Sequence, residues 1–274
     1  MIAILMATYN GGKYLSEQID SIFKQTYHDW KLYIRDDGSS DDTINIINTY
    51  IKGNHNIHLI QDDYSKKGAK WNFMHLLESI DADYYMFCDQ DDVWLPNKIS
   101  RELSEIQKIE KPGVPALVCS DLCIVDPSLQ TIDESFWRYM KLRPSFLTQK
   151  RYAISCNLFT GCTMIFNNKA KEVSLPFTEY MILHDYWIGL NVIAHNGAIG
   201  AIPEQLILYR QHQNNVCGAQ PIGKSLSYYT GKIRYINKVA RDYREKFLMA
   251  NNIYKGKIGI LYFLYNRLVY LVKR

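Results

Sequence analysis

Short apolar runs alternate with helix-like repeats along the first part of the chain. Four mostly apolar runs, each followed by a turn signal or a polar cluster, have the length of strands: residues 2–7, 32–34, 57–60 and 84–88. Between them, apolar residues recur every three or four positions, which predicts helices through residues 15–23, 44–51 and 71–80. Pro96 suits the first turn of a further helix.

This alternation predicts an α/β fold with a mostly parallel sheet, helices on both faces and right-handed crossovers. In such sheets ligands bind beyond the carboxyl ends of the strands. The loops expected at that edge are residues 7–9, 36–40 and 89–92, and the last two are rich in carboxylates. The rhythm loosens after Pro112, where three further strands and one helix are indicated: residues 116–119, 162–166 and 206–209, and residues 184–194.

Charge is distributed unevenly along the chain. The net charge is +4, but residues 223–274 contain 12 Lys and Arg against 2 Asp and Glu, a net of +10, so the first 222 residues carry −6. An acidic body with a basic tail suggests two different partners. We expect residues 1–222 to form one domain and residues 223–274 a basic, amphipathic helical tail.

Nothing in the sequence predicts secretion or a membrane span. The N-terminus has no basic segment before its apolar run, and no stretch reaches the roughly 18 consecutive apolar residues of a spanning helix. The six cysteines form no CxxC pair and have no zinc spacing, which favours reduced thiols. We expect a cytoplasmic protein without a nucleic-acid partner.

Three aspartates, Asp89, Asp91 and Asp92, crowd directly behind the fourth apolar run. Like charges beside a buried strand repel one another and are costly to desolvate. One carboxylate would suffice to cap the following helix, whereas three exceed that need. Asp89 and Asp91 offer two oxygen ligands for a hard divalent cation, the usual way of holding Mg²⁺ beside a diphosphate. No GxGxxG follows the first strand, no P-loop motif occurs, and neither acidic stretch fits a calcium loop.

Five motifs extend over about residues 1–215: ATYNGGKYLSEQIDSIFKQTY, YIRDDGSSDDT, CDQDDVW, LHDYW and LYRQHQNN. Their order resembles that of family 2 glycosyltransferases, inverting enzymes of the GT-A fold. The resemblance implies a Rossmann-like GT-A sheet, a nucleotide-sugar donor and Mg²⁺ or Mn²⁺. It also implies that Thr8 and Tyr9 line the base and ribose, and that Asp36 or Asp37 hydrogen-bonds the base.

The other motifs supply the expected diphosphate and metal ligands. By the resemblance, Asp89 would contact ribose or metal and Asp91 would ligate the metal. Arg210 would pair with the diphosphate, because guanidinium suits phosphate geometry. His212 would be a further metal ligand or, alternatively, a solvated histidine in an exposed loop.

Asp185, in LHDYW, is the expected catalytic base. It would accept the proton of an acceptor hydroxyl as that oxygen attacks the anomeric carbon, with inversion and without a protein nucleophile. The family often has an acidic residue before this aspartate, where this chain has His184. A helix N-terminus that favours negative charge would explain Asp185 equally well. Trp187 would stack on an acceptor sugar, and core packing is an alternative for it.

The expected function is non-processive glycosyl transfer, because the QxxRW motif of processive synthases is absent. DQDDVW together with YRQHxxN is similar to bacterial rhamnosyltransferases of cell-surface polysaccharide synthesis. This makes dTDP-rhamnose the first expected donor and a UDP-hexose the second, with a glycan or lipid-linked acceptor. The alternatives are a sugar-nucleotide-binding module without transfer and a sugar nucleotidyltransferase.

The tail predicts an amphipathic helix on an anionic membrane, at the inner face of the cell membrane. Its apolar stripe consists of Leu226, Tyr229, Ile233, Ile236, Tyr243 and Phe247. Its basic residues at the remaining positions are Lys232, Arg234, Lys238, Arg241, Arg244 and Lys246. Residues 258–272 are apolar but too short to span. Packing on the body and a homodimer contact are the alternatives.

Overall fold

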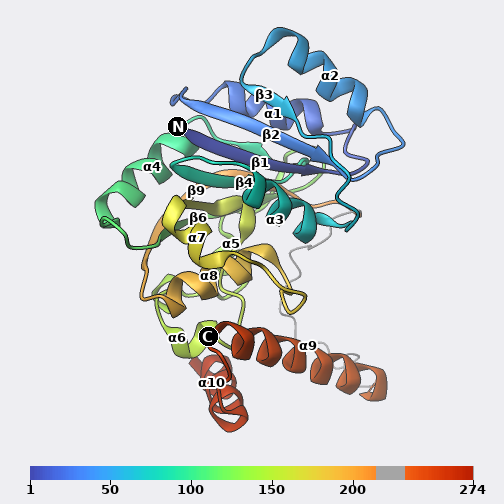
Figure 1. Cartoon of the computed structure of the whole chain (residues 1–274). Helices are drawn as coiled ribbons and strands as arrows, with labels where there is room; N and C mark the ends of the chain where they lie inside the picture. The colour runs from blue at the N-terminus through green and yellow to red at the C-terminus, as the bar shows by residue number, and fades with distance from the viewer. Residues whose placement is uncertain (214–231, 274) are drawn as a thin grey trace.

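The computed structural model describes residues 1–213 and 232–273. Figure 1 shows a twisted central sheet with helices on both sides, and two C-terminal helices at the end of the molecule away from α2. The strands are β1 (Ile2–Thr8), β2 (Trp30–Asp36), β3 (Ile57–Leu59), β4 (Tyr84–Cys88), β5 (Val93–Trp94), β6 (Ala116–Val125), β7 (Thr131–Asp133), β8 (Met164–Asn167) and β9 (Ala198–Arg210). The helices are α1 (Leu15–Phe23), α2 (Thr43–Gly53), α3 (Ala69–Ser79), α4 (Lys98–Ile109), α5 (Phe136–Tyr139), α6 (Lys150–Ala153), α7 (Asn168–Ser174), α8 (His184–Ala194), α9 (Lys232–Ile253) and α10 (Ile260–Lys273).

The sheet has the strand order β3-β2-β1-β4-β8-β6-β9-β5, with β7 paired to β6. Strands β1, β2, β3, β4, β6 and β9 run in one direction, whereas β5, β7 and β8 run against them. The predicted α/β fold with a mostly parallel sheet is confirmed. The strand predicted at residues 162–166 is present as β8, but its antiparallel direction between β4 and β6 was not predicted, because an apolar run carries no information about strand direction.

Strand β1 is buried on both faces. Ile2, Ile4 and Met6 belong to a core shared with α1, α2 and α4. Ala3 and Leu5 belong to a second core, shared with α3 and α8. Successive side chains of a strand point to opposite faces, so a continuous apolar run serves two layers of helices. This is the arrangement that the alternation of strands and helices predicted.

The strand register brings the polar loops to one edge. Thr8, the last residue of β1, pairs with Asp36, the last residue of β2. On the other side of β1, Met6 pairs with Cys88, the last residue of β4, so Asp89 leaves the sheet at the same edge. The predicted convergence of the three loops is therefore present. The helix expected from Pro96 begins at Lys98, and α8 spans its predicted residues.

The C-terminal helices pack on the body of the protein. Met249 of α9, together with Phe263 and Tyr270 of α10, belongs to the same buried cluster as the residues of α8. Tyr243 and Phe247, which were expected on a membrane-facing stripe, pack against this cluster. The predicted boundary at residue 222, the stripe residues Leu226 and Tyr229, and the side chains of residues 232–237 lie outside the described residues. No helix within the described ranges is long and apolar enough to cross a membrane.

Candidate active site

The ends of β1 and β2 form a rigid polar corner. Thr8 is buried, and its hydroxyl donates to Oδ1 of Asp36 at 2.8 Å. Oδ1 also accepts from the Ser39 hydroxyl, and Oδ2 accepts from the backbone N–H groups of Gly38 and Ser39. A carboxylate has about four acceptor positions, so Asp36 uses its capacity within the loop. Tyr9 follows with a side chain that is 58% exposed.

A shallow pocket of about 260 Å³ lies next to this corner. One wall is the buried Arg35, whose guanidinium is paired with Asp62 at 3.0 Å. Asp37 stands nearby in sequence, and its Oδ2 accepts from the N–H of Gly68 at 2.6 Å. The pocket is lined by Arg35, Asp36, Gly38, Ile44, Leu59, Ile60, Gln61 and Asp62.

Gln90 ties the β4 loop to the β1 loop. Its Nε2 donates to the carbonyl of Tyr9 at 3.0 Å, and its Oε1 accepts from the N–H of Tyr9 at 2.9 Å. A Cβ at Gly11 would lie 2.2 Å from that Oε1, so a larger residue there would displace the Gln90 amide. Sequence reasoning missed Gln90, although its position between Asp89 and Asp91 was a signal that could have been used.

Behind Gln90, two carboxylates and a thiol converge. Ligand atoms of Asp89, Asp92 and Cys162 all lie within 4.8 Å of one another. Asp92 is completely buried; its Oδ1 accepts from the N–H of Arg210 at 3.1 Å, while its Oδ2 has no hydrogen-bond partner. A buried carboxylate oxygen without a partner is costly unless a proton or a cation compensates it.

The crowding changes the protonation of this group. Burial, reinforced by the charges of Asp91 and then Asp185, raises the pKa of Asp89 to about 7. Burial and the same kind of repulsion raise the pKa of Asp92 well above its usual range. Both raised pKa values show that the carboxylates are buried close together without enough nearby positive charge, among the described residues, to stabilise their ionised forms. The donor set of carboxylate oxygens fits a hard divalent cation.

His212 lies beside Asp91. Its Nε2 is 2.8 Å from Oδ2 of Asp91, and its ring stacks on Tyr14 with centroids 5.1 Å apart. Both side chains are mostly buried, at 13% and 15% exposed, so the alternative of a solvated loop histidine is wrong.

Arg210 has a different place from the predicted one. It is buried, and its guanidinium donates to the carbonyls of Asp91 (2.9 Å) and Pro127 (2.6 Å) and to the Glu17 carboxylate. It also lies over the ring of Tyr14 at 4.4 Å. The guanidinium N–H groups donate to acceptors of the protein itself, so the expected pairing of Arg210 with a diphosphate is not supported. Arg210 positions the turn that carries the acidic group.

Asp185 opens α8 and is 8% exposed. Its Oδ1 accepts from the N–H of Tyr186 (2.6 Å) and from Asn157 (3.2 Å), and its Oδ2 accepts from the N–H of Gly161 (3.1 Å). Burial raises its pKa to about 6, although these donors oppose the shift. Cys162, which follows Gly161 in the chain, belongs to the cluster with Asp89 and Asp92. The turn Gly161–Thr163 thus brings Asp185 to the Asp89 cluster, from positions far apart in the sequence.

His184, which replaces the acidic residue common in the family, is wedged between the rings of Phe73 and Phe87, with centroids 4.4 Å and 4.7 Å away. Burial lowers its pKa to about 3, so it is neutral at pH 7. A Cβ at Gly161 would lie 2.6 Å from its Nε2, which explains a glycine beside Asp185.

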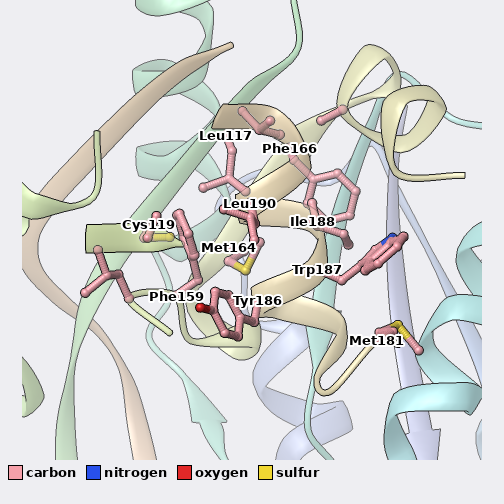
Figure 2. Close-up of a cluster of buried hydrophobic side chains, with 14 of the residues drawn as sticks. Leu117, Cys119, Phe159, Met164, Phe166, Met181, Tyr186, Trp187, Ile188 and Leu190 are labelled. Carbon is pink, nitrogen blue, oxygen red and sulfur yellow. The ribbon is translucent and has the colours of Figure 1, made fainter. Parts of the chain in front are cut away.

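Trp187 does not face the site. It is 3% exposed, its Nε1 donates to the carbonyl of Ser174 at 2.7 Å, and Figure 2 shows it among buried apolar side chains with Met181 and Ile188. The expectation that it stacks on an acceptor sugar is therefore wrong, and the packing alternative holds. Asn157 and Gly161, which do contact Asp185, left no local signal in the sequence.

Comparisons with known proteins agree with this geometry. The family model described as "Glycosyl transferase family 2" matches residues 3–173, more than half of the chain. The dTDP-rhamnosyl transferase RfbG of Shigella flexneri is 28% identical, covering 93% of this chain and 90% of that protein. The UDP-Glc:alpha-D-GlcNAc-diphosphoundecaprenol beta-1,3-glucosyltransferase WfgD of Escherichia coli is 25% identical, with 79% of each chain covered.

Solved structures share the fold. S. aureus TarS in complex with UDP-GlcNAc superposes with a TM-score of 0.60 and 14% identity, covering 97% of this chain and 79% of that one. The mannosyltransferase PcManGT from Pyrobaculum calidifontis, in complex with GDP-Man and Mn²⁺, gives 0.56 and 13%, covering 99% and 79%. At such identities the likeness concerns the fold alone. Fold, acidic edge and family match lead to one conclusion: the chain belongs to glycosyl transferase family 2.

Proposed function

We propose that this glycosyltransferase moves one sugar per encounter from a nucleoside-diphosphate donor to a hydroxyl of a glycan or lipid-linked acceptor, with inversion at the anomeric carbon. The observation that carries the proposal is the placement of Asp185. A buried carboxylate with a pKa of about 6 lies next to the acidic group at the end of β4. A base and a cation-binding edge in one place are the two elements that an inverting transfer needs.

The chain's own residues bind and orient the reactants. The exposed ring of Tyr9 and the pocket beside Asp36 suit a nucleoside. Because Asp36 uses its acceptor positions inside the loop, Asp37 is the better candidate for a contact to the base. Asp185 is mostly ionised at pH 7 and takes the proton of the attacking hydroxyl. The N–H groups of Gly161 and Tyr186 and the amide of Asn157 hold its carboxylate in place.

Asp89 and Asp91 would hold Mg²⁺ or Mn²⁺, with His212 beside Asp91 and Asp92 behind it. The unpartnered Oδ2 of Asp92 and the raised pKa values of Asp89 and Asp92 support a missing positive charge. When bound, the cation stabilises the negative charge of the departing diphosphate. Arg210, which is paired with Glu17, donates to the carbonyl of Asp91 and so helps to fix the turn that carries the three aspartates.

The donor follows from the relatives. We propose dTDP-rhamnose first, since RfbG, named as a dTDP-rhamnosyl transferase, matches over most of both chains. A UDP-hexose is second, since WfgD is named as using UDP-Glc. The acceptor named for WfgD is alpha-D-GlcNAc-diphosphoundecaprenol, a lipid-linked sugar. We therefore also propose work in bacterial surface polysaccharide synthesis, on the cytoplasmic side of the membrane.

The test is a screen of the purified protein against dTDP-rhamnose, UDP-glucose, UDP-GlcNAc and GDP-mannose with Mn²⁺ or Mg²⁺. Release of the nucleoside diphosphate reports turnover, and NMR of the product reports the anomeric configuration. Asp185→Asn serves as the matched control. Binding of a donor without turnover would favour a sugar-nucleotide-binding module. Release of pyrophosphate from a nucleoside triphosphate and a sugar phosphate would favour a nucleotidyltransferase.

A further inference from the structure

Helix α10 has an apolar face that no described part of the chain covers. Leu261 and Val272 are 80% and 78% exposed. At about 100° per residue, the exposed apolar positions form one stripe about 140° wide that contains no charged residue. The stripe consists of Ile260, Leu261, Leu264, Tyr265, Leu268, Leu271 and Val272.

The opposite face of α10 fixes the helix on the body. Phe263 and Tyr270 are buried in the cluster that contains α8, and Tyr270 packs against Phe146 and Tyr152. Arg267 turns inward, where its guanidinium donates to Sγ of Cys156 at 2.7 Å. The exposed stripe is therefore held outward by the packing of the other side.

The dimensions of α10 decide how such a stripe can meet a bilayer. Its 14 residues make a helix about 21 Å long, shorter than the hydrocarbon core of about 30 Å. A short helix with one broad apolar face lies in the plane of the interface instead of crossing it. Tyr262 and Tyr265, also exposed, have the apolar body and polar tip that suit this depth.

Charge selects the partner. Lys255 and Lys257 are exposed in the turn before α10, and Lys273 is exposed at its end. The whole segment of residues 223–274 carries a net charge of +10. Two copies joined through α10 would bring two such segments together and repel each other, whereas an anionic lipid surface complements them.

We infer that the apolar face of α10 inserts into the interface of an anionic bilayer, while α9 packs against α8 and, through Phe247 and Phe263, against α10. This differs from the expectation that the stripe of α9 lies on the membrane, because Tyr243 and Phe247 face the protein. Figure 1 shows α9 and α10 together at one end of the molecule. Helix α8, which carries Asp185 in its first turn, packs against α9 and α6, and α6 packs against α10.

The test is cosedimentation of the full chain with vesicles of equal parts phosphatidylglycerol and phosphatidylcholine, and with vesicles of phosphatidylcholine alone. We expect binding to the anionic vesicles that weakens as salt is raised. The double variant Leu264→Glu, Leu268→Glu should bind at least about tenfold more weakly. Its control is Ile132→Glu, which puts one negative charge at an exposed apolar position of β7, outside the tail.

Two further measurements complete the test. Leu268→Trp should give a blue-shifted emission that brominated lipids quench, which reports burial in the acyl region. Light scattering in solution reports the oligomeric state. No binding by the unaltered chain, or equal binding by the double variant, overturns the inference. A dimer that the double variant converts to a monomer, without vesicle binding, assigns the stripe to a second copy instead. None of these readouts requires turnover, so they stand apart from the test of glycosyl transfer.

Discussion

The acidic edge of the sheet buries charged side chains, whereas the outer face of α10 exposes apolar ones, and both are unusual in a globular protein. At the edge, carboxylates are buried: Asp92 is fully inaccessible and Asp185 is 8% exposed. On α10, leucines that a globular protein would bury stand in solvent, with Leu261 80% exposed. Buried charges and broad exposed apolar surfaces both cost free energy in the isolated protein.

Under the two proposals above, each region would be compensated by a partner of the opposite character. A cation and a diphosphate sugar would compensate the carboxylates, and a lipid interface would cover the leucines. The two regions differ in what supports them. Arg210 and Gln90 hold the acidic edge by donating to backbone carbonyls, and the N–H of Gly161 donates to the carboxylate of Asp185. Helix α10 is held by apolar packing of Phe263 and Tyr270.

The largest effect is expected from removing the cation. Excess EDTA should reduce turnover to the background, because no cation would then stabilise the negative charge of the departing diphosphate. Asp91→Asn should do the same, since it removes a charged ligand and the partner of His212. Asp63→Asn, an exposed aspartate on the β3 side, is the control and should keep full activity. Turnover that persists in EDTA would show that the acidic edge needs no cation.

Asp185→Asn should lower turnover by roughly 10²–10⁴-fold, the usual contribution of a general base. Donor affinity should change little, because the substitution keeps the size of the side chain. An amide facing the N–H of Gly161 loses one acceptor, so stability should fall by about 1–3 kcal/mol. A thermal melt therefore accompanies the kinetics. A loss of only a few-fold in turnover would assign the base to another residue.

A pH profile tests the same group without mutation. A base must be ionised to act, and burial raises the pKa of Asp185 to about 6. Turnover should therefore fall about tenfold per pH unit below about pH 6 and level off above it. Donor binding, measured in parallel, should not follow the same curve. A flat profile between pH 5 and pH 8 would contradict the role of Asp185.

The sequence predicted the residues at the acidic edge of the sheet more accurately than the residues that hold this edge in place. The apolar runs of β1, β2 and β4 have a simple period and end in polar loops, so Thr8, Asp36 and Asp89 could be brought together in advance. The role of Arg210 could not, because its partners Glu17, in α1, and Pro127, in the turn after β6, are distant from it in the sequence. The predicted sugar contact of Trp187 was wrong for the same reason, since only tertiary packing decides whether an aromatic side chain lies in the core or on the surface. In the tail, the spacing of apolar residues predicted helices, but it did not predict which helix face packs on the body of the protein.

The smallest effects separate the two faces of α10. Phe263→Ala should cost about 3–5 kcal/mol in the free energy of unfolding, because it opens a cavity beneath a buried ring. Leu264→Ala, at the next position but on the exposed stripe, should change it by less than about 0.5 kcal/mol. Urea unfolding of the two variants measures both values in buffer without lipid. Equal costs would mean that another part of the chain covers the stripe in solution, and the contrast between the acidic edge and α10 would then be lost.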